Sequence, residues 1–340
     1  MRTETGIFTG KRADGCACIF GKAFIAGFEG GTRMSMTATN NKVKILVTGG
    51  TVFVSRFIAE YYVAKGYEVY VLNRNNKPQS DGVNLIEADR HNLGEKLRTY
   101  HFDAVIDVAA YTGEDINCLL DALGSFGEYV FISSSAVYPE YAPQPFAEES
   151  EIAVNKFWGE YGTDKIDAET VLMRRNPNAY ILRPPYLYGP MNNVYREAFV
   201  FDCAMQGRKF YFPKNGELNL QFFHVEDLCR FIDIILENKP VQHIFNVGNK
   251  ESVSVYDWVK MCYDIAGKPL ETVKVFEDIE QRNYFSFYNY EYYLDVTKQC
   301  ELMPETKPLE DGLKEAYDWY LNNSDKVNKK PFMEYIDTNL

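Results

Sequence analysis

The sequence is poor in the residues that build disulfide frameworks and metal sites. Its 340 residues include only four histidines and seven cysteines. The cysteines are odd in number and stand mostly alone within apolar segments, and the sequence contains no C-x-x-C or H-E-x-x-H motif. This pattern predicts reduced, buried thiols in a cytoplasmic protein and no metal site.

Long apolar runs and an excess of positive charge are also missing. No apolar stretch approaches the ~20 residues that a membrane-spanning helix needs, so no membrane association is predicted. Asp and Glu outnumber Lys and Arg by 48 to 36, and the formal net charge is −12. Because nucleic-acid backbones are bound through Lys and Arg, this charge argues against a nucleic-acid partner.

One stretch of the sequence gives the clearest indication of the fold. Residues 43–74 read as a strand, a glycine turn, a helix that ends at Gly66, and a second strand, which together form a βαβ unit. In the turn 48–51, Thr-Gly-Gly-Thr, two residues without a Cβ allow the backbone to bend sharply and to approach a ligand. The helix that follows directs its free N–H groups at the same place, a geometry that suits a pyrophosphate.

This unit resembles the phosphate-binding segment of the extended short-chain dehydrogenase/reductase superfamily, which contains the NAD-dependent epimerases and dehydratases. The family pattern is T-G-x-x-G-x-x-G, and here Val52 and Ser55 occupy the positions of the second and third glycines. An atypical branch with G-G-T-x-F also lacks the second glycine, whereas Ser55 departs from the pattern and is expected to affect helix packing or the approach to the pyrophosphate. The resemblance implies an α/β fold with a Rossmann-type, doubly wound parallel sheet. It also implies that NADP or NAD is held by the turn residues Thr48, Gly49, Gly50, Thr51, Val52 and Phe53.

Further cofactor contacts are expected at the carboxyl ends of later strands, where ligands collect in such sheets. Asn73 and Arg74 stand where NAD-specific members carry an acidic residue, so a 2′-phosphate meets no repulsion and NADP is predicted in preference to NAD. Asp89 ends the third strand at a position that touches adenine in the family, with a solvated loop aspartate as the alternative. Ala109 and Ala110 end the fourth strand and leave room for ribose and phosphates.

Three polar residues resemble the catalytic set of the family. Ser134 follows the fifth strand in a segment similar to S-S-x-x-V-Y, and Tyr161 and Lys165 come later, four residues apart on one helix face. An ammonium there stabilises the phenolate and lowers the tyrosine pKa. In the family this lysine also holds the cofactor ribose, and the serine steadies the carbonyl oxygen.

Two other Tyr-x-x-x-Lys pairs show how readily 25 tyrosines produce this spacing by chance. Tyr61 and Lys65 lie on the helix of the βαβ unit, and Tyr256 and Lys260 lie far downstream. Because Tyr161 alone follows the fifth strand and its serines, the other two pairs are interpreted as helix-surface or packing residues.

The segment after the sixth strand resembles the element that opens the substrate region. Residues 183–190 are similar to R-x-x-x-x-Y-G-P, in which the proline segment with Pro184 passes the nicotinamide. Residues 222–228 resemble F-x-H-V-x-D-L, and His224 and Asp227 are interpreted as structural. Substrate contacts are expected from Ser134, Tyr186, Asn192 and Arg282, with a surface or core-lining role as the alternative for Arg282.

The predicted organisation has four parts. Residues 1–40 are expected to be a disordered or non-native extension, and residues 41–190 an NAD(P)-binding domain. Residues 191–322 are predicted to be mainly a smaller α/β substrate-binding lobe that returns to the main domain near 222–250. Residues 323–340 are expected to be a loose tail.

Together these patterns predict an NAD(P)-dependent epimerase or reductase that acts on a secondary alcohol of a nucleotide sugar or a related small molecule. Sugar-nucleotide 4,6-dehydratases carry an Asp–Glu pair directly after the catalytic residue, whereas Ser135 and Ala136 stand here. Neither side chain titrates near neutral pH, so dehydration is not predicted. A catalytically degenerate protein that uses the fold to bind nucleotides or RNA is the alternative, and a homodimer is left open.

Overall fold

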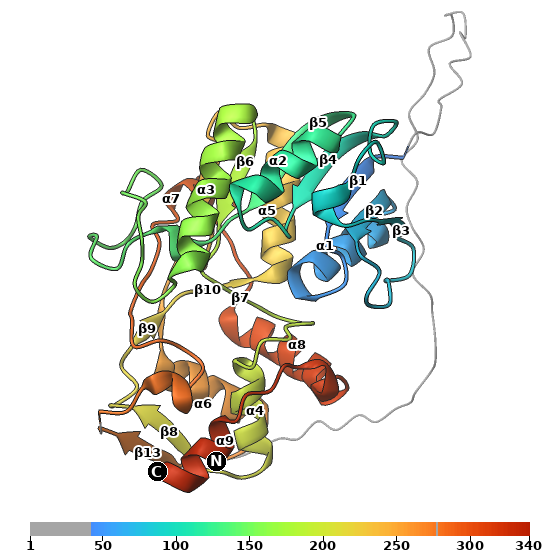
Figure 1. The fold of residues 1–340 in the computed structure, drawn as a ribbon. Helices are drawn as coiled ribbons and strands as arrows, with labels where there is room; N and C mark the ends of the chain where they lie inside the picture. Colours follow the sequence, from blue (N-terminus) through green and yellow to red (C-terminus); the bar gives the residue numbers. More distant parts are fainter. Residues whose placement is uncertain (1–41, 277) are drawn as a thin grey trace, which may run out of the picture. The chain divides into compact units, whose positions relative to one another are not determined.

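The core of the structure is a seven-stranded parallel β-sheet. The computed structural model describes residues 42–276 and 278–340 (Figure 1), and the extension predicted over residues 1–40 lies outside them. The strand order is β3-β2-β1-β4-β5-β6-β11, which reverses at β1 and is the predicted doubly wound arrangement. The strands are β1 (Lys44–Thr48), β2 (Glu68–Asn73), β3 (Asn84–Glu87), β4 (His101–Asp107), β5 (Ser125–Ile132), β6 (Tyr180–Arg183) and β11 (Ile244–Asn246).

Helices cover both faces of this sheet. Ile45 and Val47 of β1 pack with α1 and α5, whereas Leu46 between them packs with α2 and α3 on the other face. Because side chains alternate along a strand, a strand with consecutive apolar residues is buried on both faces. None of the helices in the described ranges is long and apolar enough to cross a bilayer. The covering helices are α1 (Phe53–Ala64), α5 (Val225–Asn238), α2 (Gly113–Ala122) and α3 (Glu160–Arg175).

The βαβ unit predicted for residues 43–74 is present. β1 and β2 pair in parallel, and α1 connects them across one face of the sheet. The helix ends where the sequence predicts, because Gly66 adopts a φ of +84° and its N–H donates to the carbonyl of Val63 at 2.9 Å.

The chain beyond residue 190 builds a smaller lobe of helices and short strand pairs (Figure 1). β8 pairs with β13 in parallel, and β9 pairs with β12 antiparallel. α5 and β11, which lie within residues 222–250, belong instead to the main sheet and its covering layer. Contacts join residues 42–340 into one unit, so the lobe is part of that unit and not a separate domain. The other elements beyond residue 190 are α4 (Glu197–Met205), β8 (Phe210–Pro213), β9 (Asn219–Leu220), β10 (Phe222–His224), β12 (Val253–Ser254), α6 (Val255–Ile265), β13 (Thr272–Val275), η3 (Gln281–Asn283), α7 (Thr297–Leu302), α8 (Leu309–Leu321), η4 (Ser324–Lys326) and α9 (Phe332–Asn339). Three short elements precede residue 190: η1 (Arg90–Asn92), η2 (Ser135–Val137) and β7 (Tyr186–Tyr188).

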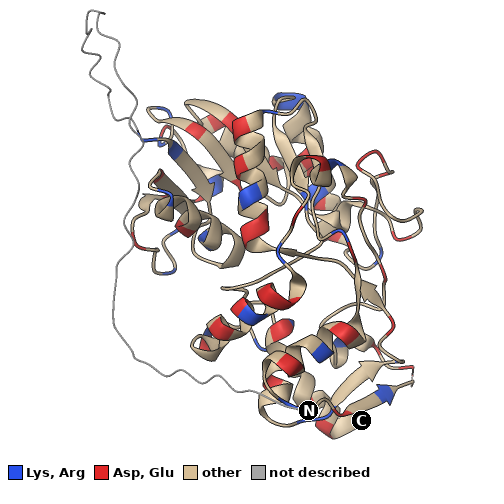
Figure 2. Ribbon diagram, turned by 180° about the vertical axis from the view of Figure 1, so that it is seen from behind, with Lys and Arg blue, Asp and Glu red and all other residues tan. Residues whose placement is uncertain are grey.

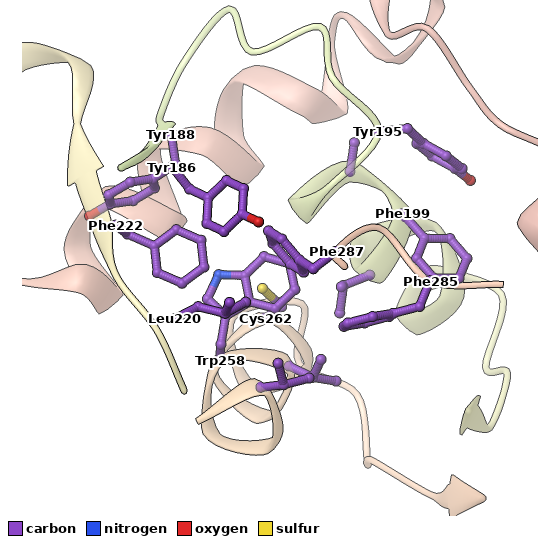
Figure 3. Packing of buried hydrophobic residues seen from close by; sticks show 14 of the residues in the cluster. Tyr186, Tyr188, Tyr195, Phe199, Leu220, Phe222, Trp258, Cys262, Phe285 and Phe287 are labelled. Atoms are coloured by element: carbon purple, nitrogen blue, oxygen red, sulfur yellow. The ribbon is translucent and has the colours of Figure 1, made fainter. Parts of the chain in front are cut away.

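Aromatic side chains form the core of this lobe. Figure 3 shows Trp258 of α6 among Phe222 and Phe287, and the ring centroids of Trp258 lie 5.6 and 5.2 Å from those two rings. Phe285 and Phe287 come from the dense aromatic run after η3, and both are fully buried. Stacked and edge-to-face pairs of this kind add to the free energy gained from apolar burial. These two aromatic residues therefore serve packing.

The prediction of a loose tail over residues 323–340 is wrong. α9 lies in this segment, and its residues Phe332 and Ile336, one helical turn apart, are buried. Phe332 stacks on Tyr195 with a centroid distance of 5.8 Å, and the ammonium of Lys329 lies 2.8 Å from the carboxylate of Asp202. An apolar pair at i,i+4 spacing is too short a pattern to identify a helix by itself, and its partner Tyr195 is distant in the sequence.

Candidate active site

The glycine turn between β1 and α1 has a backbone that other residues cannot adopt. Gly49 and Gly50 have φ angles of +92° and +87°. A Cβ on Gly50 would lie 2.5 Å from Cγ1 of Val71, and one on Gly49 would lie 2.8 Å from Oγ of Ser55. α1 begins directly after this turn without a side-chain cap, so its first N–H groups are left for another acceptor. The turn thus fits the anionic pyrophosphate of a dinucleotide.

Ser55 occupies the position of the third family glycine and fits there. Its side chain is 8% exposed, and its hydroxyl donates to the carbonyl of Val52 at 3.0 Å. The missing Cβ of Gly49 provides the space. The departure from the family pattern is therefore accommodated within the first turn of α1.

A cavity of about 360 Å³ lies at the carboxyl ends of β1, β2 and β3, and we call it the β2-side cavity. Arg74 and Asp89 line it and are exposed, and Arg74 makes no ion pair with a described residue. Asn73 also lines it, but its amide donates to the carbonyl of Gly49 at 2.7 Å and so holds the glycine turn. The residues that line this cavity are Thr48, Gly49, Leu72, Asn73, Arg74, Ala88, Asp89, Arg90, His91, Ala109 and Asp115.

A buried carboxylate supports the floor of the β2-side cavity. Asp107 accepts hydrogen bonds from Thr48, Arg90 and Tyr129, each at 2.6 Å. Burial alone would raise the pKa of Asp107, but Arg90 and these hydrogen bonds outweigh it and hold the pKa below its usual value. The hydroxyl of Thr48 thus makes its hydrogen bond within the protein, and Thr48 is 1% exposed. Sequence reasoning missed Arg90 and Asp107, because nothing local marks them as partners.

A second cavity, of about 410 Å³, adjoins the first at Ala109, and we call it the tyrosine cavity. It collects Ser134 from the end of β5 and Tyr161 and Lys165 from α3, so the three predicted catalytic residues share one cavity. The residues that line it are Val52, Phe53, Val54, Ser55, Val108, Ala109, Tyr111, Ile132, Ser133, Ser134, Tyr161, Lys165, Pro184, Pro185, Leu187, Val194 and Arg196.

The ammonium of Lys165 is held deep in the wall of the tyrosine cavity. It donates to the backbone carbonyls of Ala110 and Ile132 at 2.8 and 2.9 Å. Burial lowers the pKa of Lys165 to about 8, although the carboxylates of Asp107 and Glu169 act in the opposite direction. At neutral pH the lysine is therefore mostly charged, and it is placed close to losing its proton.

Tyr161 and Ser134 form the more open side of the cavity. Tyr161 is 38% exposed. Desolvation raises the pKa of its hydroxyl, and hydrogen bonding to Ser134 opposes that rise, so the lowered tyrosine pKa predicted from the Tyr161–Lys165 spacing is not found. The hydroxyl of Ser134 also accepts the N–H of Ala136 at 3.1 Å, which fixes its orientation. Both side chains thus line the same cavity.

The structure brings some of the predicted ligand contacts into these cavities and leaves others out. Ala109 and Pro184 line the tyrosine cavity, and Val52 and Phe53 do so beside the glycine turn. Ala110 has no exposed surface, and only its carbonyl participates, as the acceptor for Lys165.

Three residues predicted to contact substrate lie outside the tyrosine cavity. Tyr186 is 8% exposed in the aromatic core, and the amide of Asn192 donates to the carboxylate of Glu197 at 2.7 Å. The guanidinium of Arg282 lies over the ring of Tyr288 at 4.8 Å and lines a different cavity of about 920 Å³.

Arg196 lines the tyrosine cavity and was missed by sequence reasoning. Its guanidinium lies over the ring of Tyr186 at 5.1 Å and makes no ion pair with a described residue. The residue follows the Tyr-Gly-Pro turn by several positions, and no motif marks it.

The other two Tyr-x-x-x-Lys pairs have structural partners. Tyr61 and Lys65 both bind the carboxylate of Asp233, at 2.6 and 2.7 Å, and so tie α1 to α5. Lys260 pairs with Asp264 one turn along α6. These contacts support the choice of Tyr161 by its position in the chain.

A buried ion pair anchors α3 beside the tyrosine cavity. The carboxylate of Glu169 accepts from Nε and Nη2 of Arg183 at 3.0 and 2.6 Å, and the hydroxyl of Ser133 also donates to it. The other arm of Arg183 donates to the hydroxyl of Tyr138 at 2.8 Å. The pair joins α3 to the ends of β5 and β6, the two strands that lead to Ser134 and Pro184.

A doubly wound sheet with a glycine turn at its strand reversal is the architecture of Rossmann-type proteins of the extended short-chain dehydrogenase/reductase superfamily. A sequence model of the NAD dependent epimerase/dehydratase family matches residues 45–124 and 116–248, and the chain belongs to this family.

Individual relatives differ in what their names describe. The chloroplast stem-loop binding protein of 41 kDa b from Arabidopsis thaliana is 26% identical over 306 residues, which cover 82% of this chain and 80% of that protein. A trifunctional UDP-glucose 4,6-dehydratase/UDP-4-keto-6-deoxy-D-glucose 3,5-epimerase/UDP-4-keto-L-rhamnose-reductase of the same plant is 24% identical over 331 residues, which cover 85% of this chain and 49% of the relative. This chain thus spans about half the length of that relative.

The fold is also similar to solved structures. UDP-glucuronic acid 4-epimerase from Bacillus cereus, in complex with UDP-glucuronic acid and NAD, aligns with a TM-score of 0.65 and 21% identity, covering 82% of this chain and 99% of that one.

We expect Glu169→Gln to lower the free energy of unfolding by about 3 kcal/mol, because it leaves the buried guanidinium of Arg183 without a counter-charge. Urea unfolding measures the change. The control is Asp264→Asn, which breaks an exposed pair and should leave the free energy of unfolding almost unchanged. A loss of stability no larger than that of the control would show that the buried pair does not hold α3.

Proposed function

We propose that the protein is an NAD(P)-dependent oxidoreductase or epimerase that acts on a secondary alcohol of a nucleotide sugar or a related small molecule. The observation that carries this proposal is the tyrosine cavity, in which Ser134, Tyr161 and Lys165 meet beside the glycine turn. A protein that only binds nucleotides has no need of a phenol and an ammonium group in the wall of one cavity.

Each of these residues has a distinct task in the proposed reaction. Tyr161 takes the proton of the substrate hydroxyl as the alcohol becomes a carbonyl, and returns it in the reverse direction. In the proposed reaction the charge of Lys165 favours the phenolate, and Ser134, which lines the same cavity, holds the substrate oxygen in line. A bound nicotinamide supplies the hydride acceptor and donor. Oxidation and reduction on opposite faces of a sugar give epimerisation, and a single step gives a dehydrogenase or a reductase.

The two cavities support a dinucleotide as the cofactor. They meet at Ala109 beside a turn whose glycines leave no space for a Cβ. In the β2-side cavity Arg74 offers an exposed guanidinium without an ion-pair partner among the described residues, and the adjacent Asn73 carries no charge. We infer a preference for NADP, because a guanidinium binds a 2′-phosphate that an acidic residue would repel.

Names of relatives and the basic residues of the site favour an anionic sugar substrate. The trifunctional relative and the Bacillus cereus epimerase carry UDP-sugars in their names. Arg196 provides a guanidinium in the tyrosine cavity, and Arg282 provides one in the neighbouring lobe. Guanidinium groups engage phosphate or carboxylate oxygens in pairs.

Dehydration is the activity of the family that this site supports least. Ser135 and Ala136, which follow Ser134, are 3% and 1% exposed and carry no titratable group near neutral pH. A 4,6-dehydratase needs an acid and a base in those places. An epimerase or a simple reductase needs only the groups that line the tyrosine cavity.

A role in RNA binding is the alternative, and the stem-loop binding relative is its best support. The charge balance opposes it, since Asp and Glu exceed Lys and Arg by 48 to 36. Figure 2 shows both signs of charge interspersed on the helices of the described chain. A phosphate backbone requires a concentrated basic surface.

We expect Tyr161→Phe to reduce kcat by about 10²–10⁴-fold and to leave cofactor binding intact, because the hydroxyl serves proton transfer. Steady-state kinetics and cofactor titration measure the two effects. Tyr61→Phe, which alters the structural pair on α1, is the matched control and should retain activity. A Tyr161→Phe enzyme within a few-fold of wild type would remove this hydroxyl from the mechanism.

Arg74→Ala should weaken NADP binding about tenfold or more and change NAD binding less than about twofold, since it removes a charged hydrogen-bond donor to the 2′-phosphate. Calorimetric titration with both cofactors provides the measurement. Arg98→Ala, at a surface ion pair away from the cavity lining, is the control. Tighter binding of NAD than NADP by the wild type would contradict the inferred preference.

A panel of UDP-, GDP- and dTDP-sugars, incubated with NAD(H) or NADP(H) and followed by mass spectrometry, tests the reaction type. We expect an isomer of unchanged mass, separated by chromatography, or a product changed by two hydrogens. A product that has lost water would overturn the assignment against dehydration.

A further inference from the structure

Three potential metal ligands meet beside the β2-side cavity, which one of them, His91, lines. Glu114 and Cys118 lie one turn apart on α2, and His91 lies on η1, which follows β3. The sulfur of Cys118 is 3.8 Å from Nδ1 of His91 and 3.3 Å from Oε1 of Glu114. The donor atoms of the three residues all lie within 4.8 Å of one another.

A fourth residue, Asp115, determines which ring nitrogen of His91 carries a hydrogen. Nε2 of His91 lies 3.0 Å from Oδ1 of Asp115, a carboxylate that is 8% exposed and that also accepts the backbone N–H groups of Tyr111 and Thr112. A carboxylate only accepts, so Nε2 of His91 carries a hydrogen, and in the neutral ring Nδ1, which lies on the side of Cys118, then has the lone pair. Histidines that bind metals commonly donate their other N–H to a carboxylate in this way.

We propose that His91, Glu114 and Cys118 bind a divalent transition-metal ion, with Zn²⁺ as the best match. Zinc bonds of about 2.0–2.3 Å in a tetrahedron place neighbouring donor atoms ~3.5 Å apart, close to the two measured separations. Thiolate, imidazole and carboxylate are the donors that Zn²⁺ takes. Binding forms a Zn–S bond and releases the thiol proton to solvent, and water fills the fourth position.

The ion would join the segment after β3 to α2. His91 lines the β2-side cavity and Asp89, two residues earlier, accepts the N–H of His91 at 2.9 Å. The bound metal would therefore fix the rim against which a dinucleotide packs. His91 and Glu114 are exposed and Cys118 is partly exposed, so the ion has a path from solvent.

The other cluster of similar composition, His224 with Glu226 and Glu315, is not suited to a metal. The ammonium of Lys307 already binds both carboxylates. Nδ1 of His224 accepts the backbone N–H of Glu226 at 3.3 Å, so its other nitrogen carries the hydrogen and offers no lone pair.

Cobalt(II) is a suitable probe because a thiolate ligand produces a near-ultraviolet charge-transfer band and tetrahedral coordination produces visible d–d bands. We would titrate Co²⁺ and then competing Zn²⁺ into the untagged full chain. Cys16→Ser and Cys18→Ser are included throughout, because these cysteines lie outside the described residues. One equivalent of Co²⁺ should generate both bands, and Zn²⁺ should remove them.

Matched variants assign the site. Loss of an outer-shell partner alone typically weakens metal binding about 10–100-fold, so Cys118→Ser and His91→Gln should each weaken it by at least as much. Cys300→Ser and His101→Gln, at a cysteine and a histidine outside the cluster, should leave the spectrum unchanged. Thermal melting verifies that each variant is folded. Absence of the bands in the parent chain, or their survival in Cys118→Ser, would overturn the proposal.

Discussion

The buried pair of Glu169 and Arg183 holds the helix of the candidate active site in place. Tyr161, Lys165 and Glu169 follow one another at intervals of four residues, so they lie along one face of α3. Taking two charges out of water costs free energy, and here the bidentate contact and the hydroxyl groups of Ser133 and Tyr138 complete the hydrogen bonding. The gain is geometric, because a planar guanidinium donates two hydrogen bonds to a carboxylate in few orientations. The rotation of α3, and with it the direction of Tyr161, depends on this contact.

A second constraint is the lack of side chains in the glycine turn. Val71 and Ser55 take up the space that a Cβ on Gly50 or Gly49 would need. Beneath the turn, Asp107 accepts three hydrogen bonds and orients the ends of β1 and β4. The polar groups behind the two cavities are thus bound to one another, whereas the guanidinium groups of Arg74 and Arg196 on the ligand side have no ion-pair partner among the described residues.

Local patterns were sufficient for the main sheet and for part of the site. The βαβ unit was predictable because consecutive apolar residues, a glycine pair and a terminating Gly66 all lie within one short stretch. Chain order separated Tyr161 from Tyr61 and Tyr256, since a tyrosine after the fifth strand falls at the carboxyl edge of the sheet. The same reasoning failed for α9, where two apolar residues leave no visible period.

The sequence by itself determined the order of strands and helices, the glycine turn and the spacing of Tyr161 and Lys165, because hydrogen bonding and side-chain periodicity act over a few residues. Tertiary structure alone decided which partners the buried charged groups find and which potential metal ligands meet. Arg90 finds Asp107 seventeen positions away, Glu169 finds Arg183 on another element, and His91 reaches Cys118 across two segments. Such contacts depend on how strands and helices pack. The residues next to a side chain in the sequence do not indicate which residues lie next to it in space.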